Sequence, residues 1–127
     1  MNVVVDTSIW VEYFRGTGAG ALDSLLEDGR VLLVPVVAAE LLSAPLSPRE
    51  RAAIRRVLED LPLHPTPLEH WCSVGELRAK CRRLGLSVST PDAHVAQCAF
   101  DAQAELWSGD AIFSQMAQKI GLQVFKS

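Results

Sequence analysis

Asn2-Val3-Val4-Val5-Asp6-Thr7-Ser8-Ile9-Trp10 contains the pattern of a buried strand that passes directly into a helix. The valine run is continuous rather than alternating, as is typical of a strand covered on both faces of a parallel sheet. Asp6-Thr7-Ser8 offers the short polar side chains that begin helices, and apolar residues follow at helical spacing. We therefore predict that a central strand ends at Asp6 and that a helix starts at once.

Strand and helix patterns alternate along the rest of the chain. Further strands are predicted at 31–34, 105–108 and 122–125, whereas the proline-rich segment 62–67 leaves room only for a short edge strand. After the first helix, a break at 15–18 is predicted, followed by a short helix with Leu22, Leu25 and Leu26. The later predicted helices cover 36–43, a segment from Pro48 with Ser47 and Glu50 as a capping box, a long helix from Pro67 capped by Thr66, a helix after Ser89 or Thr90, and 111–119. The long helix has an apolar stripe of Trp71, Val74, Leu77, Cys81 and Leu84. Strands separated by helices predict an α/β fold with a parallel sheet covered on both faces.

Composition indicates one ordinary domain, residues 1–127. The chain has 127 residues, of which 49% are hydrophobic, so it can bury a core without disulfides or a structural metal. Its three cysteines form no C-x-x-C pair and no Cys/His cluster of zinc type. We expect them to be thiols in a reducing cytosol. No basic leader precedes the first strand and no apolar run approaches the ~20 residues of a membrane span, so a cytoplasmic protein without membrane contact is predicted.

Charge is distributed unevenly although the net charge is only −3. Two runs of basic residues stand out, and each is either a solvated helix face or a surface that contacts phosphates. The runs are Arg49, Arg51, Arg55 and Arg56, and Arg78, Lys80, Arg82 and Arg83.

Four acids lie where apolar residues surround them or where a strand ends. Asp6 and Asp110 directly follow predicted strands, and in a parallel sheet the ligand crevice lies beyond the carboxyl ends of the strands. Asp92 opens a helix, and Glu40 lies within an aliphatic helix. Taken singly, Asp6 and Asp110 could cap helices and Asp92 could interact with a helix dipole.

Glu40 is harder to explain as an ordinary helix residue. Its neighbours at i±3 and i±4 are Val36, Val37, Ser43 and Ala44, so no base is placed to pair with it. We expect it to be buried, and a buried unpaired glutamate must be protonated or bound to a metal. A shared explanation for all four acids is a site for Mg²⁺ or Mn²⁺, which prefer oxygen ligands, rather than for zinc.

The histidines are not expected to contribute to this site. His64 lies in the proline-rich segment and His70 on a long helix, while His94 cannot share a helix face with Asp92 two residues before it. We predict surface or rim positions for all three.

Four segments resemble the motifs of PIN-domain proteins, in particular the VapC-type toxins of toxin–antitoxin pairs. They are Val3-Val4-Val5-Asp6-Thr7-Ser8-Ile9-Trp10, Val36-Val37-Ala38-Ala39-Glu40-Leu41, Pro91-Asp92-Ala93-His94-Val95-Ala96 and Ser108-Gly109-Asp110-Ala111-Ile112-Phe113. The resemblance spans the chain and includes the four acids in the expected order. It implies a three-layer α/β/α sandwich with a central, mainly parallel sheet of four or five strands.

The resemblance also implies a Mg²⁺- or Mn²⁺-dependent ribonuclease. Asp6, Glu40, Asp92 and Asp110 would form the catalytic pocket, and three of them, Asp6, Asp92 and Asp110, would bind the metal. Hydroxyl groups of Thr7, Ser8 and Ser108 would support them. The bound ion would activate a water for attack on an RNA phosphodiester, with Glu40 or Asp92 orienting that water. RNA phosphates would contact the basic runs, chiefly at Arg49, Arg51, Arg55, Arg56, Arg82 and Arg83.

Two positions depart from the family pattern. Ser108 stands where threonine is usual, which keeps the hydroxyl group. Ile112 stands where many members carry another acid, so four acids remain, enough for one ion. The partners implied are an RNA substrate, a VapB-like antitoxin and a second copy in a homodimer, and some of Trp10, Tyr13 and Phe14 could line an antitoxin groove instead of the core.

Other classes with strand-end acids fit less well. A receiver domain needs adjacent acids after the first strand and a lysine after a later one, and a haloacid-dehalogenase-like phosphatase needs D-x-D, where this chain has Ser8. A nucleotide-binding module needs a glycine-rich loop after the first strand. The alternative that stays open is a catalytically inactive PIN-like domain that binds RNA or protein.

Overall fold

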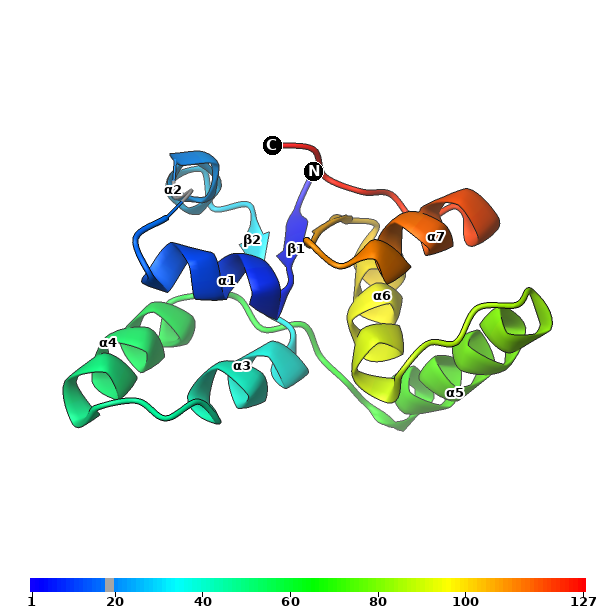
Figure 1. The fold of residues 1–127 in the computed structure, drawn as a ribbon, viewed down its shortest axis with the longest axis horizontal. Coiled ribbons are helices and arrows are strands. Elements are labelled where there is room, and N and C mark those ends of the chain that lie inside the picture. The colour runs from blue at the N-terminus through cyan, green and yellow to red at the C-terminus, as the bar shows by residue number, and fades with distance from the viewer. Residues whose placement is uncertain (18–19) are drawn as a thin grey trace.

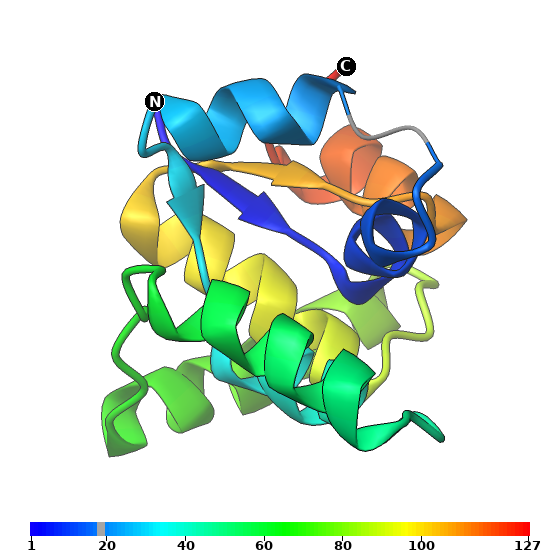
Figure 2. The ribbon, with the colours of Figure 1, turned by 90° about the vertical axis from the view of Figure 1, so that its left-hand side faces the viewer.

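The computed structural model describes residues 1–17 and 20–127 and contains a parallel sheet in the order β2-β1-β3 (Figures 1 and 2). Its strands are β1 (Val3–Val5), β2 (Val31–Leu32) and β3 (Glu105–Trp107). The central position of β1 explains its continuous valine run, because all three side chains are at most 1% exposed.

Both edges of the sheet extend by a single bridge rather than by a full strand. Leu33 pairs in parallel with Leu63, and Leu106 with Val124. The first edge stays short because the prolines of 62–67 have no N–H to donate to a ladder. The predicted strands at 62–67 and 122–125 therefore occupy the expected places but are reduced to one pairing each.

Seven helices cover the sheet on both sides within the described residues. They are α1 (Thr7–Phe14), α2 (Gly20–Glu27), α3 (Pro35–Leu42), α4 (Pro48–Glu59), α5 (Leu68–Arg83), α6 (Thr90–Ala102) and α7 (Ala111–Ile120). In Figure 1, α1 to α4 lie on one side of the strands and α5 to α7 on the other. The predicted three-layer arrangement is confirmed. None of the helices in the described ranges is long and apolar enough to span a membrane.

Helix starts agree with the local sequence in most cases. Ser47 and Glu50 form both hydrogen bonds of a capping box, and Ser89 caps α6 by accepting from the Asp92 N–H at 3.2 Å. The prediction that Thr66 caps α5 is wrong, because Pro67 occupies that position. Gly18, which we placed in the break between α1 and α2, lies outside the described residues.

The predicted apolar stripe of α5 is partly wrong. Val74, Leu77 and Cys81 are buried, but Trp71 and Leu84, at the two ends of the stripe, are 42% and 41% exposed. The reason is that the middle of α5 packs against α6. Trp71 instead lays its ring parallel to that of His94, with ring centroids 4.7 Å apart.

Candidate active site

Asp6 is buried at the point where β1 passes into α1, beside the carboxyl end of β3. Its backbone N–H donates to the Trp107 carbonyl at 2.9 Å, which joins the two strand ends. Asp6 occupies the N-cap position of α1, yet its side chain makes no capping hydrogen bond. The carboxylate instead accepts from the Ser108 hydroxyl at 2.7 Å. Helix capping therefore does not explain why an aspartate stands here.

Hydroxyl groups connect this strand end with the loop before α7. Ser8 Oγ lies 3.4 Å from both Asp6 Oδ2 and Ser108 Oγ, and it accepts from the Gly109 N–H at 3.1 Å. The Asp110 N–H donates to Ser108 Oγ at 3.0 Å. Asp110, like Asp6, is at an N-cap without a side-chain capping bond. Ser108 thus holds both the Asp6 carboxylate and the Asp110 backbone, and neither carboxylate caps its helix.

The four predicted acids act on one another electrostatically. Burial raises the pKa of Asp6, the Ser108 and Thr7 hydrogen bonds oppose this rise, and the charges of Asp110 and Asp92 add to it. Burial also raises the pKa of Asp92, with further contributions from Asp110 and Glu40. Like charges raise each other's pKa only when they are near one another. The fold therefore gathers acids from four separate segments around the carboxyl end of the sheet.

Glu40 is not buried, contrary to the expectation from its aliphatic neighbours. It is exposed on α3, and its Oε1 accepts from the Thr7 hydroxyl at 2.7 Å. The short helix α3 buries only Val37 and Leu41, which lie on one face, and Glu40 falls on the neighbouring face toward α1. Asp110 is likewise exposed and Asp92 half-buried, so only Asp6 is a fully buried acid of this group.

The donor chemistry of this group suits a hard divalent cation. Its ligand atoms are all carboxylate oxygens, and a cation would offset the burial and the repulsion that raise the pKa of Asp6 and Asp92. The acids are not packed as one tight ligand set, since among the described residues only His64, His70 and Cys98 have three donor atoms within 4.8 Å of one another. Mg²⁺ keeps several waters and needs only one or two direct carboxylates, so the wider spacing is compatible with it.

The predicted rim positions of the histidines are wrong for two of the three. His70 is 3% and His94 0% exposed, and His64 is half-buried. Burial and the neighbouring His70 and His64 lower the pKa of His94 to about 4, so its ring is neutral near pH 7. The two-residue spacing does place His94 and Asp92 on different faces of α6, as predicted. The face that carries His94, however, is the one that packs against α5.

The sequence shows no Cys/His motif of zinc type, but the fold brings donor atoms of two histidines and one cysteine within 4.8 Å of one another. His64 lies beyond a sheet edge, His70 on α5 and Cys98 on α6, so no short motif contains them. One signal was available in the sequence. Cys98 follows His94 by four residues on the alanine-rich face of α6, which places both side chains in the interior.

The basic runs lie on α4 and α5, which flank the strands on opposite sides in Figure 1. Some of these side chains have structural partners. Arg51 donates to the Leu42 carbonyl at 2.6 Å, Arg55 pairs with Glu59 at 2.7 Å, and Arg78 donates to the Val88 carbonyl at 2.9 Å. Other members of the runs are also exposed: Arg49, Arg56, Arg82 and Arg83.

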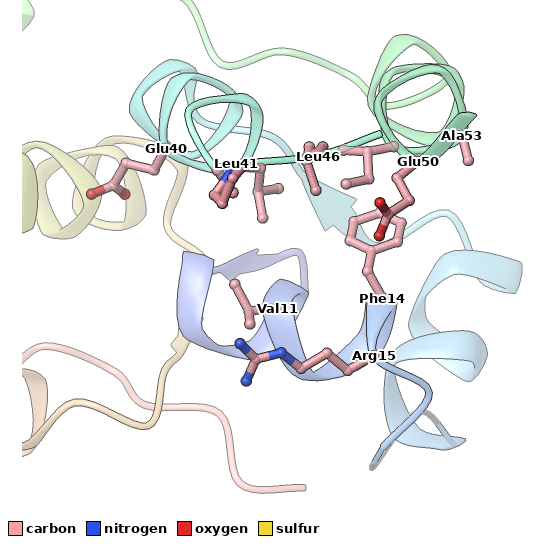
Figure 3. Close-up of a pocket in the computed structure, with 11 residues that line it drawn as sticks. Val11, Phe14, Arg15, Glu40, Leu41, Leu46, Glu50 and Ala53 are labelled. Atoms are coloured by element: carbon pink, nitrogen blue, oxygen red, sulfur yellow. The ribbon is translucent and has the colours of Figure 1, made fainter. Parts of the chain in front are cut away.

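A groove of about 380 Å³ runs between α1 and the α3–α4 pair (Figure 3). Val11, Phe14, Leu41 and Leu46 line it with apolar side chains. Glu40 lies at one end, where its carboxylate points toward the α6 side of the molecule. Trp10 does not line the groove and belongs to the core, being 0% exposed. The groove therefore adjoins the acidic group through Glu40.

Comparisons with known proteins agree with this geometry. The family model described as "PIN domain" matches residues 3–119. The chain is 33% identical to the VapC ribonuclease Mb1587 of Mycobacterium bovis and to the ribonuclease VapC11 of Mycobacterium tuberculosis, covering 95% of this chain and 96% of each relative. Its fold is similar to chains in the DNA-bound VapBC of Salmonella typhimurium and in VapBC2 of Rickettsia felis bound to a promoter DNA fragment. The Salmonella typhimurium chain has a TM-score of 0.83 at 15% identity, over 98% of this chain and 97% of that chain. The Rickettsia felis chain has a TM-score of 0.79 at 17% identity, over 98% of both chains.

Proposed function

Because this chain belongs to the PIN domain family, we propose that it is a single-domain, metal-dependent endoribonuclease and the toxin of a toxin–antitoxin pair. The observation that carries the proposal is the group of four acids at the carboxyl end of the sheet, where Ser108 and Ser8 hold the buried Asp6 and Thr7 holds Glu40. Burial and the charges of neighbouring acids of the group raise the pKa of Asp6 and Asp92. The relatives at 33% identity are named as VapC ribonucleases and match over nearly the whole chain. The substrate class is RNA, and the bond cleaved is the phosphodiester.

In this proposal each acid has a separate task. Asp6, Asp92 and Asp110 hold Mg²⁺ or Mn²⁺, and the bound ion supplies a Lewis acid beside the scissile phosphate. Glu40 or Asp92 accepts a hydrogen bond from the attacking water and orients it. Ser108 and Ser8 hold the Asp6 carboxylate, and Thr7 holds Glu40, so these hydroxyl groups position the acids without contacting the phosphate themselves.

We propose that the exposed arginines bind RNA phosphates. Arg49, Arg56, Arg82 and Arg83 are the best candidates, because Arg51 and Arg55 already have partners in the fold. Phosphate contacts of this kind bind the backbone of RNA without reading its sequence. Their places on α4 and α5 would let RNA approach the acids from both sides.

The groove between α1 and α3–α4 is the proposed site for a VapB-like antitoxin. An apolar channel that ends at Glu40 suits a segment that inserts apolar side chains beside Phe14 and carries a base toward the acids. Such a partner would cover the acidic group and block access of RNA. Assembly as a homodimer stays a prediction.

The substitution Asp6→Asn tests the nuclease assignment. It removes one negative charge from the buried centre of the group while keeping the size of the side chain. We expect the rate of RNA cleavage with Mg²⁺ or Mn²⁺ to fall by about a hundredfold or more, because electrostatic groups at a reacting phosphate are worth that much. The measurement is single-turnover cleavage of total RNA by the purified protein, free of antitoxin.

Asp28→Asn is the matched control, since Asp28 is exposed after α2 and far along the chain from the acids. It should cleave at the parent rate. Equal activity of Asp6→Asn and the parent would contradict the proposal. If the parent protein binds RNA but never cuts it with either ion, the alternative of an inactive binding module is correct.

A further inference from the structure

A second group of metal-binding side chains lies away from the acids, in the interior between α5, α6 and the edge of the sheet. It consists of His64, His70 and Cys98, and we name it the His/Cys cluster. One donor atom from each of these residues lies within 4.8 Å of the other two. His70 and Cys98 are buried and His64 is half-buried. Nothing in the proposed cleavage of RNA requires these side chains.

His70 has a ring nitrogen that the protein does not satisfy. Its Nε2 lies 2.7 Å from His94 Nδ1, a contact that needs one N–H and one lone pair. Its other ring nitrogen, Nδ1, is buried and has no hydrogen-bond partner among the described residues. Buried polar atoms are normally paired, so an unpaired one indicates a missing partner. When Nε2 donates to His94, Nδ1 presents a lone pair to that partner.

The hydrogen bond to His94 is the arrangement that a metal-bound histidine requires. Metal-binding histidines nearly always donate their second ring N–H to a neighbouring acceptor, which fixes the orientation of the ring. The parallel ring of Trp71 covers His94. For His94 Nδ1 to accept from His70, the neutral His94 ring must carry its proton on Nε2, which replaces the long 3.5 Å contact from the Val36 N–H to that atom. His94 therefore supports His70 from the side opposite to Nδ1.

Asp101 supplies a carboxylate beside the same nitrogen. Its Oδ2 lies 3.5 Å from His70 Nδ1, too far for a good hydrogen bond, while Gln97 holds its Oδ1 at 2.9 Å. On α6, Asp101 follows Cys98 by three residues, so the two side chains share a face of the helix. Asp101 thus lies next to both His70 and Cys98.

We propose that His64, His70 and Cys98 bind a zinc ion, with Asp101 as the fourth ligand. Imidazole nitrogen and thiolate sulfur are the donors that zinc prefers, and four ligands complete its usual tetrahedron. Zinc–nitrogen and zinc–sulfur bond lengths place neighbouring ligands roughly 3.3 to 3.8 Å apart. The cluster, whose donor atoms lie within 4.8 Å of one another, reaches this spacing if its side chains close by about 1 Å.

The ion would join three segments that lie apart in the sequence. His64 follows the bridge at Leu63, His70 lies in the first turn of α5, and Cys98 lies in α6. Cys98 is six residues after Asp92, about 9 Å along the same helix. The zinc site is therefore structurally separate from the acidic group, although both depend on α6.

Cobalt binding tests the site with a signal specific for sulfur. Co²⁺ replaces zinc in tetrahedral sites and gives a thiolate charge-transfer band together with visible d–d bands. The titration uses the full-length Asp6→Asn protein, stripped of metal with a chelator, so that the acids contribute less to binding. We expect one equivalent of Co²⁺ to produce both bands and one equivalent of Zn²⁺ to remove them.

Substitutions within the cluster should remove this signal. Cys98→Ser should abolish the charge-transfer band, and His64→Ala should weaken Co²⁺ binding at least tenfold. Cys72→Ser is the control, because Cys72 is an exposed thiol on α5 outside the cluster, and it should keep both bands. Circular dichroism shows whether each variant is folded, and His64→Ala keeps the test valid if Cys98→Ser does not fold.

Two outcomes would overturn the zinc site. One is a stripped, folded protein that develops no charge-transfer band with Co²⁺. The other is a band that survives Cys98→Ser or disappears in Cys72→Ser. Neither outcome bears on RNA cleavage, because the readout is metal binding in a variant that lacks Asp6.

Discussion

Ser108 controls the ionisation of the most buried acid. Its hydroxyl donates to Asp6 at 2.7 Å and lowers the pKa that burial has raised. The same oxygen accepts from the Asp110 N–H, so one side chain positions two acids. This explains why a hydroxyl residue is needed here and why serine serves in place of the usual threonine.

We predict that Ser108→Ala shifts the pH dependence of cleavage toward higher pH. Loss of the hydrogen bond raises the pKa of Asp6 further, so a larger fraction is protonated and unable to hold a cation. A hydrogen bond to a charged group is worth about 1.5–3 kcal/mol, which corresponds to a tenfold or larger loss of activity near neutral pH. The measurement is cleavage rate as a function of pH at constant Mg²⁺.

Ser108→Thr should restore the parent profile because it returns the hydroxyl group. Ser114→Ala, an exposed position on α7, should leave the profile unchanged. An unshifted profile for Ser108→Ala would show that Asp6 does not depend on this hydrogen bond.

Glu40 offers a second prediction, because its charge and its hydrogen bond can be separated. Glu40→Gln keeps an acceptor for the Thr7 hydroxyl but loses the charge, whereas Glu40→Ala loses both. We expect both variants to bind Mn²⁺ less tightly and to cleave RNA more slowly. Because Glu40 is exposed, thermal unfolding should change little, by about 1 kcal/mol or less in stability. A collapse of the thermal transition in Glu40→Ala would instead assign Glu40 a structural role.

Among the elements, α1 contributes to two different surfaces. Its first turn carries Thr7 and Ser8 beside the acids, and its last turn carries Phe14 into the groove shared with α3 and α4 (Figure 3). Trp10 lies between these ends and is fully buried, with its ring stacked 5.7 Å from that of Phe14. A partner in the groove would therefore contact the same helix that places Thr7 and Ser8 beside the acids.

We predict that Phe14→Asp prevents capture of the antitoxin. A carboxylate in place of this ring puts a charge into an apolar groove, which opposes binding of an apolar partner segment. The measurement is co-purification of the tagged protein with the small protein encoded by the neighbouring reading frame, expressed together. Leu68→Asp is the control, because Leu68 is 79% exposed on α5, outside the groove. Retention of the partner by Phe14→Asp, together with loss in Leu68→Asp, would place the partner elsewhere.

At the scale of the whole molecule, the acidic group links metal binding to stability. Burial, together with nearby charges, raises the pKa of Asp6 and Asp92 above the value of 3.8 for an unperturbed aspartate. A raised pKa means that the folded protein holds these protons to higher pH than the unfolded chain does. Their contribution to stability is therefore present below pH 3.8 and is lost as the pH rises through the folded-state pKa.

A divalent cation should reverse this loss, because it binds the ionised carboxylates and only in the folded state. We predict that the increase in Tm caused by Mn²⁺ is small near pH 4 and grows toward about pH 7, as protons cease to compete. Differential scanning calorimetry with and without Mn²⁺ measures it. Asp6→Asn should give a smaller increase at every pH, and an increase independent of pH would contradict a carboxylate site.

Local patterns correctly predicted most elements of the fold. The valine run of β1, the capping box of α4 and the Ser89 cap of α6 are each set by residues within a few positions of one another. The periodicity of apolar residues and the capping of helices depend on residues close together in the sequence, so both can be predicted from the sequence alone. The segment 62–67 pairs briefly at the sheet edge, as its prolines indicated, whereas 122–125 was overestimated as a strand, because pairing at an edge depends on a partner elsewhere in the sequence.

The candidate site likewise has features that the sequence determines and features that only the tertiary structure decides. Their identity, their order and the strand-end positions of Asp6 and Asp110 follow from the chain alone, since consecutive parallel strands bring their carboxyl ends to one edge. The exposure of Glu40, the inward direction of His94 and the meeting of His64, His70 and Cys98 arise from packing between distant segments. Burial and long-range contact depend on which helix covers which face, and no local pattern contains that information.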